Sequence, residues 1–332
     1  MAARVLIHVG APKTGTSYLE SIIWGQRARL EADGIWMPGR GRAAHDALMG
    51  EVRGGVWRHA NPAWTWQKVA DEARRRDDVV LVSKEMLSGA TAEEATIATG
   101  PLRDEEVHII VTARQLAASL PSSWQQAVKA RMRVPFGQWL AAVRRNPGHG
   151  FWRHQDPISI AQRWAPGFPP ERVHVITMPP DSSDPTALWR RFASVIGVDP
   201  DSYEAPEKPR NESLGAVEIE LLRRVNVGLG DALPMRDPYL DNVRAHLTRP
   251  VLLRRPDKVK FGVGAEYADW LVERADQTIR ELGDYGCQII GDLEDLRPRH
   301  ELGLPSPDEV SEADIAALAV EALAKVLINA AQ

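Results

Sequence analysis

Residues 10–17, Gly-Ala-Pro-Lys-Thr-Gly-Thr-Ser, combine two glycines, a lysine and three hydroxyl side chains in one short segment. The apolar run Val5 to Val9 comes directly before it, and apolar residues at helical spacing follow from Tyr18. We therefore expect a buried strand, a short loop and a helix, in that order. Free backbone N–H groups and the positive end of a helix dipole then face the loop. The segment predicts an anion site, and the alternative is an ordinary glycine turn.

The position of the lysine indicates which kind of anion the loop is expected to bind. Loops that bind nucleoside triphosphates follow the pattern G-x-x-x-x-G-K-[ST], in which the lysine comes directly after the second glycine. Gly10 and Gly15 have that separation, yet Thr16 stands in the lysine position and Lys13 precedes the second glycine. A lysine at this point cannot wrap the β- and γ-phosphates in the usual way. We expect it at the crest of the loop, beside a terminal group that is about to be transferred.

The form Pro-Lys-Thr-Gly-Thr-Ser, residues 12–17, resembles the 5′-phosphosulfate loop of sulfotransferases that use 3′-phosphoadenosine 5′-phosphosulfate (PAPS). In that family an arginine at a strand end and a serine eight residues later bind the 3′-phosphate of the nucleotide. Here Arg114 follows the apolar run Glu106 to Ala113, and Ser122 lies eight residues further on. A guanidinium fork suits a phosphate dianion, and a hydroxyl on the next helix completes the cradle.

The resemblance, which covers residues 4–180, implies transfer of a sulfuryl group from PAPS to an acceptor hydroxyl or amine, with release of PAP and without a metal. It implies that Lys13 neutralises charge on the bridging and leaving phosphate oxygens. The residues that it implies for the donor site are Lys13, Thr14, Gly15, Thr16, Ser17, Tyr18, Arg114 and Ser122.

A second group of candidate residues follows the apolar run Val79 to Ser83. Groups just past the carboxyl ends of parallel strands face the ligand crevice, and Lys84 and Glu85 have that position. Glycan sulfotransferases resemble this region and use a glutamate near the corresponding strand end as general base, which implies that role for Glu85. Those enzymes read Glu-Lys where this chain reads Lys-Glu. The alternative is that Glu85 pairs with Lys84 or an arginine and only shapes the loop.

Histidine is the base in cytosolic arylsulfotransferases, so the nine histidines are also candidates. His45 lies in the glycine- and arginine-rich segment 39–55, which we predict to be an irregular substrate loop, and it is the second candidate for the catalytic base. His8, His108 and His174 fall in predicted strands and are expected to be packed or hydrogen-bonded. None of the histidines has metal-ligand spacing with other ligand residues, and we predict no metal.

Composition limits the classes of protein. A chain of 332 residues with 44% hydrophobic and 26% charged residues can bury a full core. The net charge of −4 argues against broad nucleic-acid binding. One cysteine, no signal peptide and no apolar run of membrane-spanning length predict a cytoplasmic protein without a membrane span. The acceptor stays open among small molecules, carbohydrates and glycolipids.

Apolar runs near residues 5, 36, 80, 108 and 174 alternate with helical patterns. This order predicts an α/β fold with a mostly parallel, doubly wound sheet that is P-loop-like and has extra C-terminal helices. We predict a single domain over residues 1–332, with a nucleotide-binding core over about 1–200 and a helical extension over about 211–332. The last helix is expected to serve in packing or in a homo-oligomer.

Two other functions are compatible with an anion-binding loop. A nucleotide kinase or NTPase with a deviant P-loop would need an aspartate that holds Mg²⁺ at a strand end, and the run Val79 to Ser83 ends without one. A protein of this fold could also bind PAP or PAPS without catalysis, as a sensor or scaffold.

Overall fold

The computed structural model describes residues 4–57, 62–180, 184–204, 213–233, 237–299 and 302–330. Contacts divide the chain into two compact units, each built from separated segments. The first unit consists of Met1–Gln115, Gly150–Pro209 and Glu273–Arg297, and the second of Leu116–His149, Arg210–Val272 and Pro298–Gln332. The predicted division near residue 200 stays a prediction. By their contacts, residues 116–149 group with the C-terminal helices.

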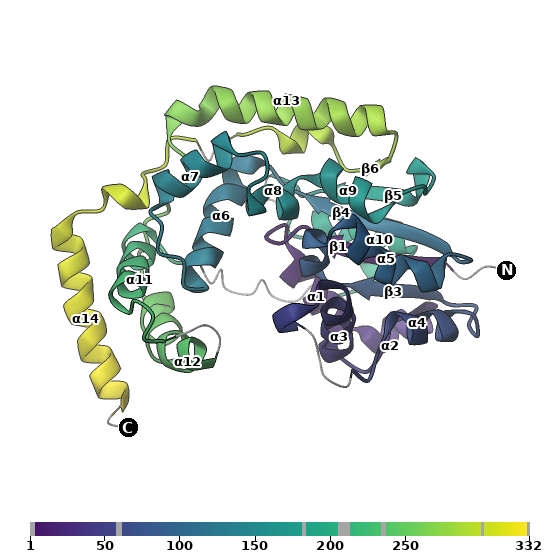
Figure 1. The fold of residues 1–332 in the computed structure, drawn as a ribbon, viewed down its shortest axis with the longest axis horizontal. Coiled ribbons are helices and arrows are strands. Elements are labelled where there is room, and N and C mark those ends of the chain that lie inside the picture. Colours follow the sequence, from purple (N-terminus) through teal and green to yellow (C-terminus); the bar gives the residue numbers. More distant parts are fainter. Residues whose placement is uncertain are drawn as a thin grey trace. The chain divides into compact units, whose positions relative to one another are not determined.

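The first unit contains a six-stranded sheet in the order β2-β3-β1-β4-β5-β6, in which all paired neighbours are parallel (Figure 1). Five strands lie where the apolar runs predicted them, and the short sixth strand was not predicted. The strands are β1 (Arg4–Gly10), β2 (Ile35–Trp36), β3 (Val79–Ser83), β4 (Glu106–Ala113), β5 (Val173–Thr177) and β6 (Gln288–Ile290).

Successive side chains of these strands enter two separate cores. Val5, Ile7 and Val9 belong to one core, and Leu6 belongs to the other. Each of these four side chains is fully buried, and burial of an aliphatic side chain contributes about 1.5–3 kcal/mol. The first core is covered by α3 (Arg42–Arg53), α4 (Trp66–Ala73), α5 (Ala92–Thr99), α9 (Pro157–Trp164) and part of α13 (Ala268–Tyr285); the second is covered by α1 (Thr16–Gly25), α2 (Arg27–Ala32) and α10 (Ala187–Ile196). The predicted doubly wound α/β fold is confirmed.

Helix α3 corrects the prediction of an irregular loop over residues 39–55. It begins after Gly41 and ends before Gly54. Its buried side includes Ala44, His45 and Leu48, at a spacing that places them on one helix face. The glycines that suggested a loop stand at the two ends of the helix, apart from one in its interior.

The second unit is helical. An aromatic cluster joins its segments: Trp124 makes edge contacts with Phe136 and Phe261, at ring-centroid distances of 5.2 and 5.8 Å. Arg224 and Glu312 form an ion pair across two of its helices at 2.7 Å. The elements are α6 (Leu116–Lys129), α7 (Phe136–Arg145), α11 (Ala216–Gly228), α12 (Asp237–Tyr239), a π-helical segment (Leu240–Thr248) and α14 (Glu312–Ala330); the remaining short helix, α8 (Gly150–Gln155), belongs to the first unit.

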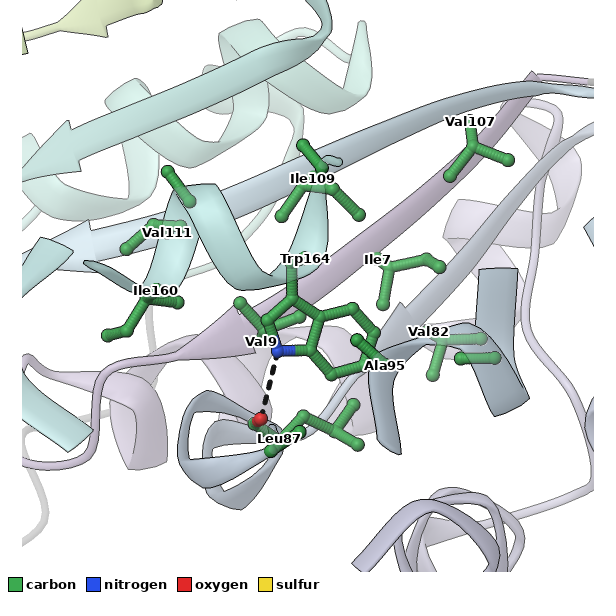
Figure 2. Packing of buried hydrophobic residues seen from close by; sticks show 14 of the residues in the cluster. Ile7, Val9, Val82, Leu87, Ala95, Val107, Ile109, Val111, Ile160 and Trp164 are labelled. Carbon is green, nitrogen blue, oxygen red and sulfur yellow. Dashed lines mark hydrogen bonds between the residues drawn. The ribbon is translucent and has the colours of Figure 1, made fainter. Parts of the chain in front are cut away.

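Helix α9 anchors η2 (Glu85–Gly89), the 3-10 helical turn that follows β3. The indole of Trp164 is fully buried between this turn and the sheet, and its Nε1 donates to the Leu87 carbonyl at 3.0 Å (Figure 2). Arg163 Nη2 donates to the Ser88 carbonyl at 2.8 Å. Two consecutive residues of α9 therefore hold the backbone of the turn that carries Glu85.

The Trp164→Phe variant tests this anchor. Loss of the indole N–H leaves the buried Leu87 carbonyl without its donor, which costs about 1–3 kcal/mol. We expect a lower free energy of unfolding in urea and faster amide exchange in residues 85–90. Trp124→Phe removes the same kind of hydrogen bond, to Val134, in the second unit. It should leave exchange in the turn unchanged, and equal exchange in both variants would refute the anchoring role.

Candidate active site

The chain between β1 and α1 has the predicted order of strand, loop and helix. Gly10, Lys13 and Gly15 have φ angles of 111°, 67° and 81°. The left-handed conformation costs a non-glycine residue such as Lys13 about 1–2 kcal/mol. Within the described residues, the backbone N–H groups of residues 14–17 donate to no backbone carbonyl. These donors stand at the positive end of α1, which is the arrangement that binds anions.

Side chains from neighbouring elements fix the loop. Thr14 is fully buried, and its Oγ1 lies 2.5 Å from both the Ala11 carbonyl and Thr112 Oγ1 of β4. Gln155 Nε2, on α8, donates to the Pro12 carbonyl at 2.8 Å. The hydroxyl of Thr14 is therefore engaged inside the protein, and its backbone N–H is the group that remains for a ligand.

A close backbone contact brings the end of β1 to the beginning of η2. A Cβ atom added at Gly10 would lie 2.4 Å from the carbonyl oxygen of Glu85, which no real Cβ can do. The Lys84 N–H also donates to the His8 carbonyl at 2.9 Å. Two features therefore require glycine at position 10: the positive φ angle and the short distance to the carbonyl oxygen of Glu85.

The sheet order places these residues at a topological switch point. The chain passes from β1 to β3 on one side of the central strand and then to β4 on the other side. Ligands of open α/β sheets bind outside the carboxyl ends of the strands at such a point. Arg114 follows β4 there, and its Nη1 donates to the Lys13 carbonyl at 3.1 Å. The structure thus brings Arg114 to the loop; Ser122 belongs to the second unit, and its pairing with Arg114 stays a prediction.

Charged side chains surround the start of η2. Lys84 Nζ lies 2.8 Å from Asp46 Oδ1 and 4.0 Å from Glu85 Oε2. Burial lowers the pKa of Lys84, but the carboxylates of Glu85 and Asp46 outweigh it, so the pKa of Lys84 is raised. The partner within hydrogen-bonding distance of Lys84 is Asp46, and Glu85 Oε2 is buried with no hydrogen-bond partner among the described residues. The ion pair at 4.0 Å fits the alternative in which Glu85 pairs with Lys84, and the role of Glu85 as a base stays a prediction.

Glu20 is a residue of this site that sequence reasoning missed. It lies on α1, and the charged groups that act on its carboxyl group are Glu85, Lys84 and Arg42. Burial raises the pKa of Glu20, and the charge of Glu85 raises it further. An acidic residue on a helix is usually solvated, so only the approach of η2 to α1 could have revealed these neighbours.

His45, the second predicted base, lies on α3 and is buried behind Ser83. Its Nδ1 is 3.2 Å from the Ser83 N–H, which donates to it. Burial lowers the pKa of His45 to about 4, so the imidazole is uncharged at neutral pH. With 1% of its surface exposed, the ring gives a substrate no direct access. A catalytic role for His45 stays a prediction, and the observed contacts are those of a packed histidine.

The three histidines in strands are packed or hydrogen-bonded, as predicted. His8 Nδ1 lies 2.8 Å from Ser83 Oγ, and His108 Nδ1 lies 2.8 Å from His174 Nε2. Within the described part of the chain, no group of three or more potential ligand residues is arranged to hold a metal ion. None of the described helices is long and apolar enough to cross a membrane.

The remaining donor-site candidates differ in exposure. Thr16 is buried and Ser17 is exposed at the beginning of α1. The Tyr18 hydroxyl is buried without a hydrogen-bond partner in the described ranges, and burial raises the pKa of Tyr18. Contact of these residues with a nucleotide stays a prediction.

Comparisons with known proteins give one structural likeness. No protein-family model matches this chain, and no curated protein matches it. A crystal structure of a sulfotransferase from Alicyclobacillus acidocaldarius is similar with a TM-score of 0.39 and 17% sequence identity, over 70% of this chain and 96% of that chain. An assignment of activity therefore rests on the residues of this chain.

The close approach at Gly10 is tested by a pair of glycine variants. Gly10→Ala places a methyl group against the Glu85 carbonyl, whereas Gly34→Ala, at a φ angle of 81°, meets no atom within 4 Å. Both variants pay the conformational cost of about 1–2 kcal/mol. We expect Gly10→Ala to lose at least ~1 kcal/mol more in urea unfolding, because the backbone of η2 must shift. Equal losses would show that the approach is not tight in solution.

Proposed function

We propose that this protein is a sulfotransferase that transfers the sulfuryl group of PAPS to a hydroxyl or amine group of a small-molecule, carbohydrate or glycolipid acceptor and releases PAP. The observation that carries this proposal is the position of Arg114, which donates to the carbonyl of Lys13 at the carboxyl end of the central strand. Arg114 and the loop that carries Lys13 thereby lie together at the switch point of a parallel sheet, which supports the proposal.

The chemistry of these groups fits a nucleotide with two separate anionic ends. The N–H groups of residues 14–17 suit the 5′-phosphate, since they stand at a helix N-terminus. The planar guanidinium group of Arg114 suits the 3′-phosphate of PAPS, a group that ATP lacks. In this proposal Ser122 completes the contact with the 3′-phosphate.

The proposed reaction is an in-line displacement at sulfur. Glu85 accepts the proton of the acceptor hydroxyl as the acceptor oxygen forms its bond to sulfur. The bond between sulfur and the bridging phosphate oxygen breaks, and its electron pair stays on that oxygen. Lys13 stabilises this developing charge by electrostatic attraction. The proton ends on Glu85, and the negative charge ends on PAP.

The residue after β3 argues against the kinase alternative. A P-loop NTPase needs a carboxylate at a strand end to hold Mg²⁺. Here the strand ends at Ser83 and is followed by Lys84, whose ammonium group lies 2.8 Å from Asp46. The strand thus ends without the aspartate of a P-loop NTPase, and Thr16 stands where such a loop has its lysine.

Calorimetric titration with PAP tests the donor. We expect PAP to bind much more tightly than AMP or ATP with Mg²⁺. Arg114→Ala should weaken PAP binding by about 10- to 100-fold, since hydrogen bonds to charged groups contribute about 1.5–3 kcal/mol. Arg103→Ala removes an arginine whose side chain is 82% exposed, and it should bind PAP like the wild type. Preference for ATP with Mg²⁺, with no effect of Arg114→Ala, would refute the proposal.

The variant Lys13→Ala separates an enzyme from a protein that only binds PAP or PAPS. If Lys13 acts on the leaving oxygen, we expect PAP affinity to change by only a few-fold while release of PAP from PAPS falls by about 10²- to 10³-fold. Release is measured with a phenol, a monosaccharide and a glycolipid as acceptors. The control is Lys68→Ala, an exposed lysine of α4. No PAP release by wild-type protein with any acceptor, together with tight PAP binding, would favour the non-catalytic function.

A further inference from the structure

Helix α14, drawn in yellow in Figure 1, has apolar residues on two sides. The buried side contains Ile315, Leu318 and Ala322. On another side, Val320 is 71% exposed, and Leu323 and Leu327 are each 61% exposed. A surface helix normally has one apolar side, and a helix that is apolar all round is normally buried. The exposed side of α14 is therefore not covered by the described residues of this chain.

The exposed side of α14 follows a heptad pattern. The residues spaced alternately three and four positions apart, as on the seam of a coiled coil, are Ala313, Ala316, Val320, Leu323 and Leu327. The positions beside such a seam usually carry charges. Here they are small and apolar as well, and they hold Ala317, Ala319, Ala324 and Val326. These seam and flanking residues are called the outer face of α14.

The charged residues of α14 all lie off the outer face and have partners within the same chain. The contacts are Glu312 with Arg224 at 2.7 Å, Asp314 with Ser311 Oγ at 2.6 Å, and Glu321 with Lys325 at 2.6 Å. The outer face thus offers no charge to a nucleic acid or a charged peptide. Helices that lie in a membrane surface are rich in Lys and Arg on their polar side, whereas three of the four charged residues of α14 are acidic.

We propose that the outer face of α14 binds the same face of a second copy of this chain, in a dimer with two-fold symmetry. An uncharged face is complemented by another uncharged face, and a second copy supplies one with a matching heptad spacing. Pairing covers roughly 700 Å² over both copies, at about 30 Å² for each exposed methyl or methylene group. Because stable dimers bury more than this area, we expect a weak, reversible dimer. The inference is independent of the proposed activity.

The sizes of the seam residues favour an antiparallel pair. The seam has alanine in its first half and leucine in its second half. In an antiparallel pair centred between residues 321 and 322, Ala316 faces Leu327 of the second copy. Val320 faces Leu323 of the second copy, so each layer combines a smaller and a larger side chain. A parallel pair would place alanine against alanine in the first half and leave that half poorly packed.

Sedimentation velocity of the whole chain between about 1 and 200 μM tests the dimer, since this range suits a weak interface. We expect the wild type to pass from monomer to dimer. Leu323→Glu places two like charges in the interface and should weaken association at least ~100-fold. The control is Val259→Glu, which adds the same charge at a 56% exposed position outside α14 and should dimerise like the wild type.

Three results of this experiment would overturn the proposal. The first is a wild type that stays monomeric at 200 μM, and the second is equal association of the wild type and Leu323→Glu. The third is a monomer that binds phosphatidylcholine vesicles and loses this binding in Leu323→Glu, which would assign the outer face to a lipid surface. Circular dichroism should show equal helix content in all three proteins, because both substituted side chains are exposed in the single chain.

A spin-label distance tests the antiparallel arrangement. The label is attached to Ala313→Cys in a Cys287→Ser background, since Cys287 is the single cysteine of the chain. In the antiparallel dimer the two labelled positions lie about 25 Å apart along the helices, at about 1.5 Å for each residue. In a parallel dimer they would lie near the interaxial distance of about 8–10 Å. The shorter distance would refute the antiparallel arrangement.

Discussion

The arrangement at the end of the central strand depends on the approach of the Gly10 backbone to the backbone carbonyl of Glu85. A side chain at position 10 would not fit between these two backbone segments. The end of the central strand β1 and the turn η2 after β3 therefore keep a fixed distance from each other. Trp164 secures the turn from its other side through the Leu87 carbonyl. The turn that is fixed in this way carries Glu85 and follows directly on Lys84, which forms an ion pair with Asp46 of α3. The position of Glu85 relative to the anion loop therefore depends on a place where only glycine fits.

Charge is divided along the carboxyl edge of the sheet. Lys13 and Arg114 lie near β1 and β4, where the proposed donor carries its negative charges. The carboxyl group of Glu85 lies after β3, where the proposed reaction removes a proton from the acceptor. Lys84 forms ion pairs with both Asp46, at 2.8 Å, and Glu85, at 4.0 Å, which reduces the repulsion between these carboxylates. In the proposed reaction, this separation lets the anion-binding groups and the base act side by side.

Much of this fold follows from local sequence patterns, and part of the site does not. Buried parallel strands are apolar throughout, so five of them were recognisable, whereas β6 has only three residues and no comparable run. Glycines concealed α3, because they bound a helix whose buried face is short. The place of Arg114 beside the anion loop could be predicted because it follows a strand end, which the sequence reveals, and its proposed role stays a prediction. Glu20 was missed because its environment is created by a partner distant in sequence.

The division of the chain between the two units has a consequence for how its length can change during evolution. The chain leaves the first unit after Gln115, directly behind Arg114, and re-enters it at Gly150. An insertion between Gln115 and Gly150 lies outside the sheet, so it changes the register of no strand. The loop between Gly10 and Gly15 has no such freedom, because left-handed residues and a backbone contact fix its path. Descendants of this chain are therefore expected to vary in length after Arg114 and to keep the length of the anion loop.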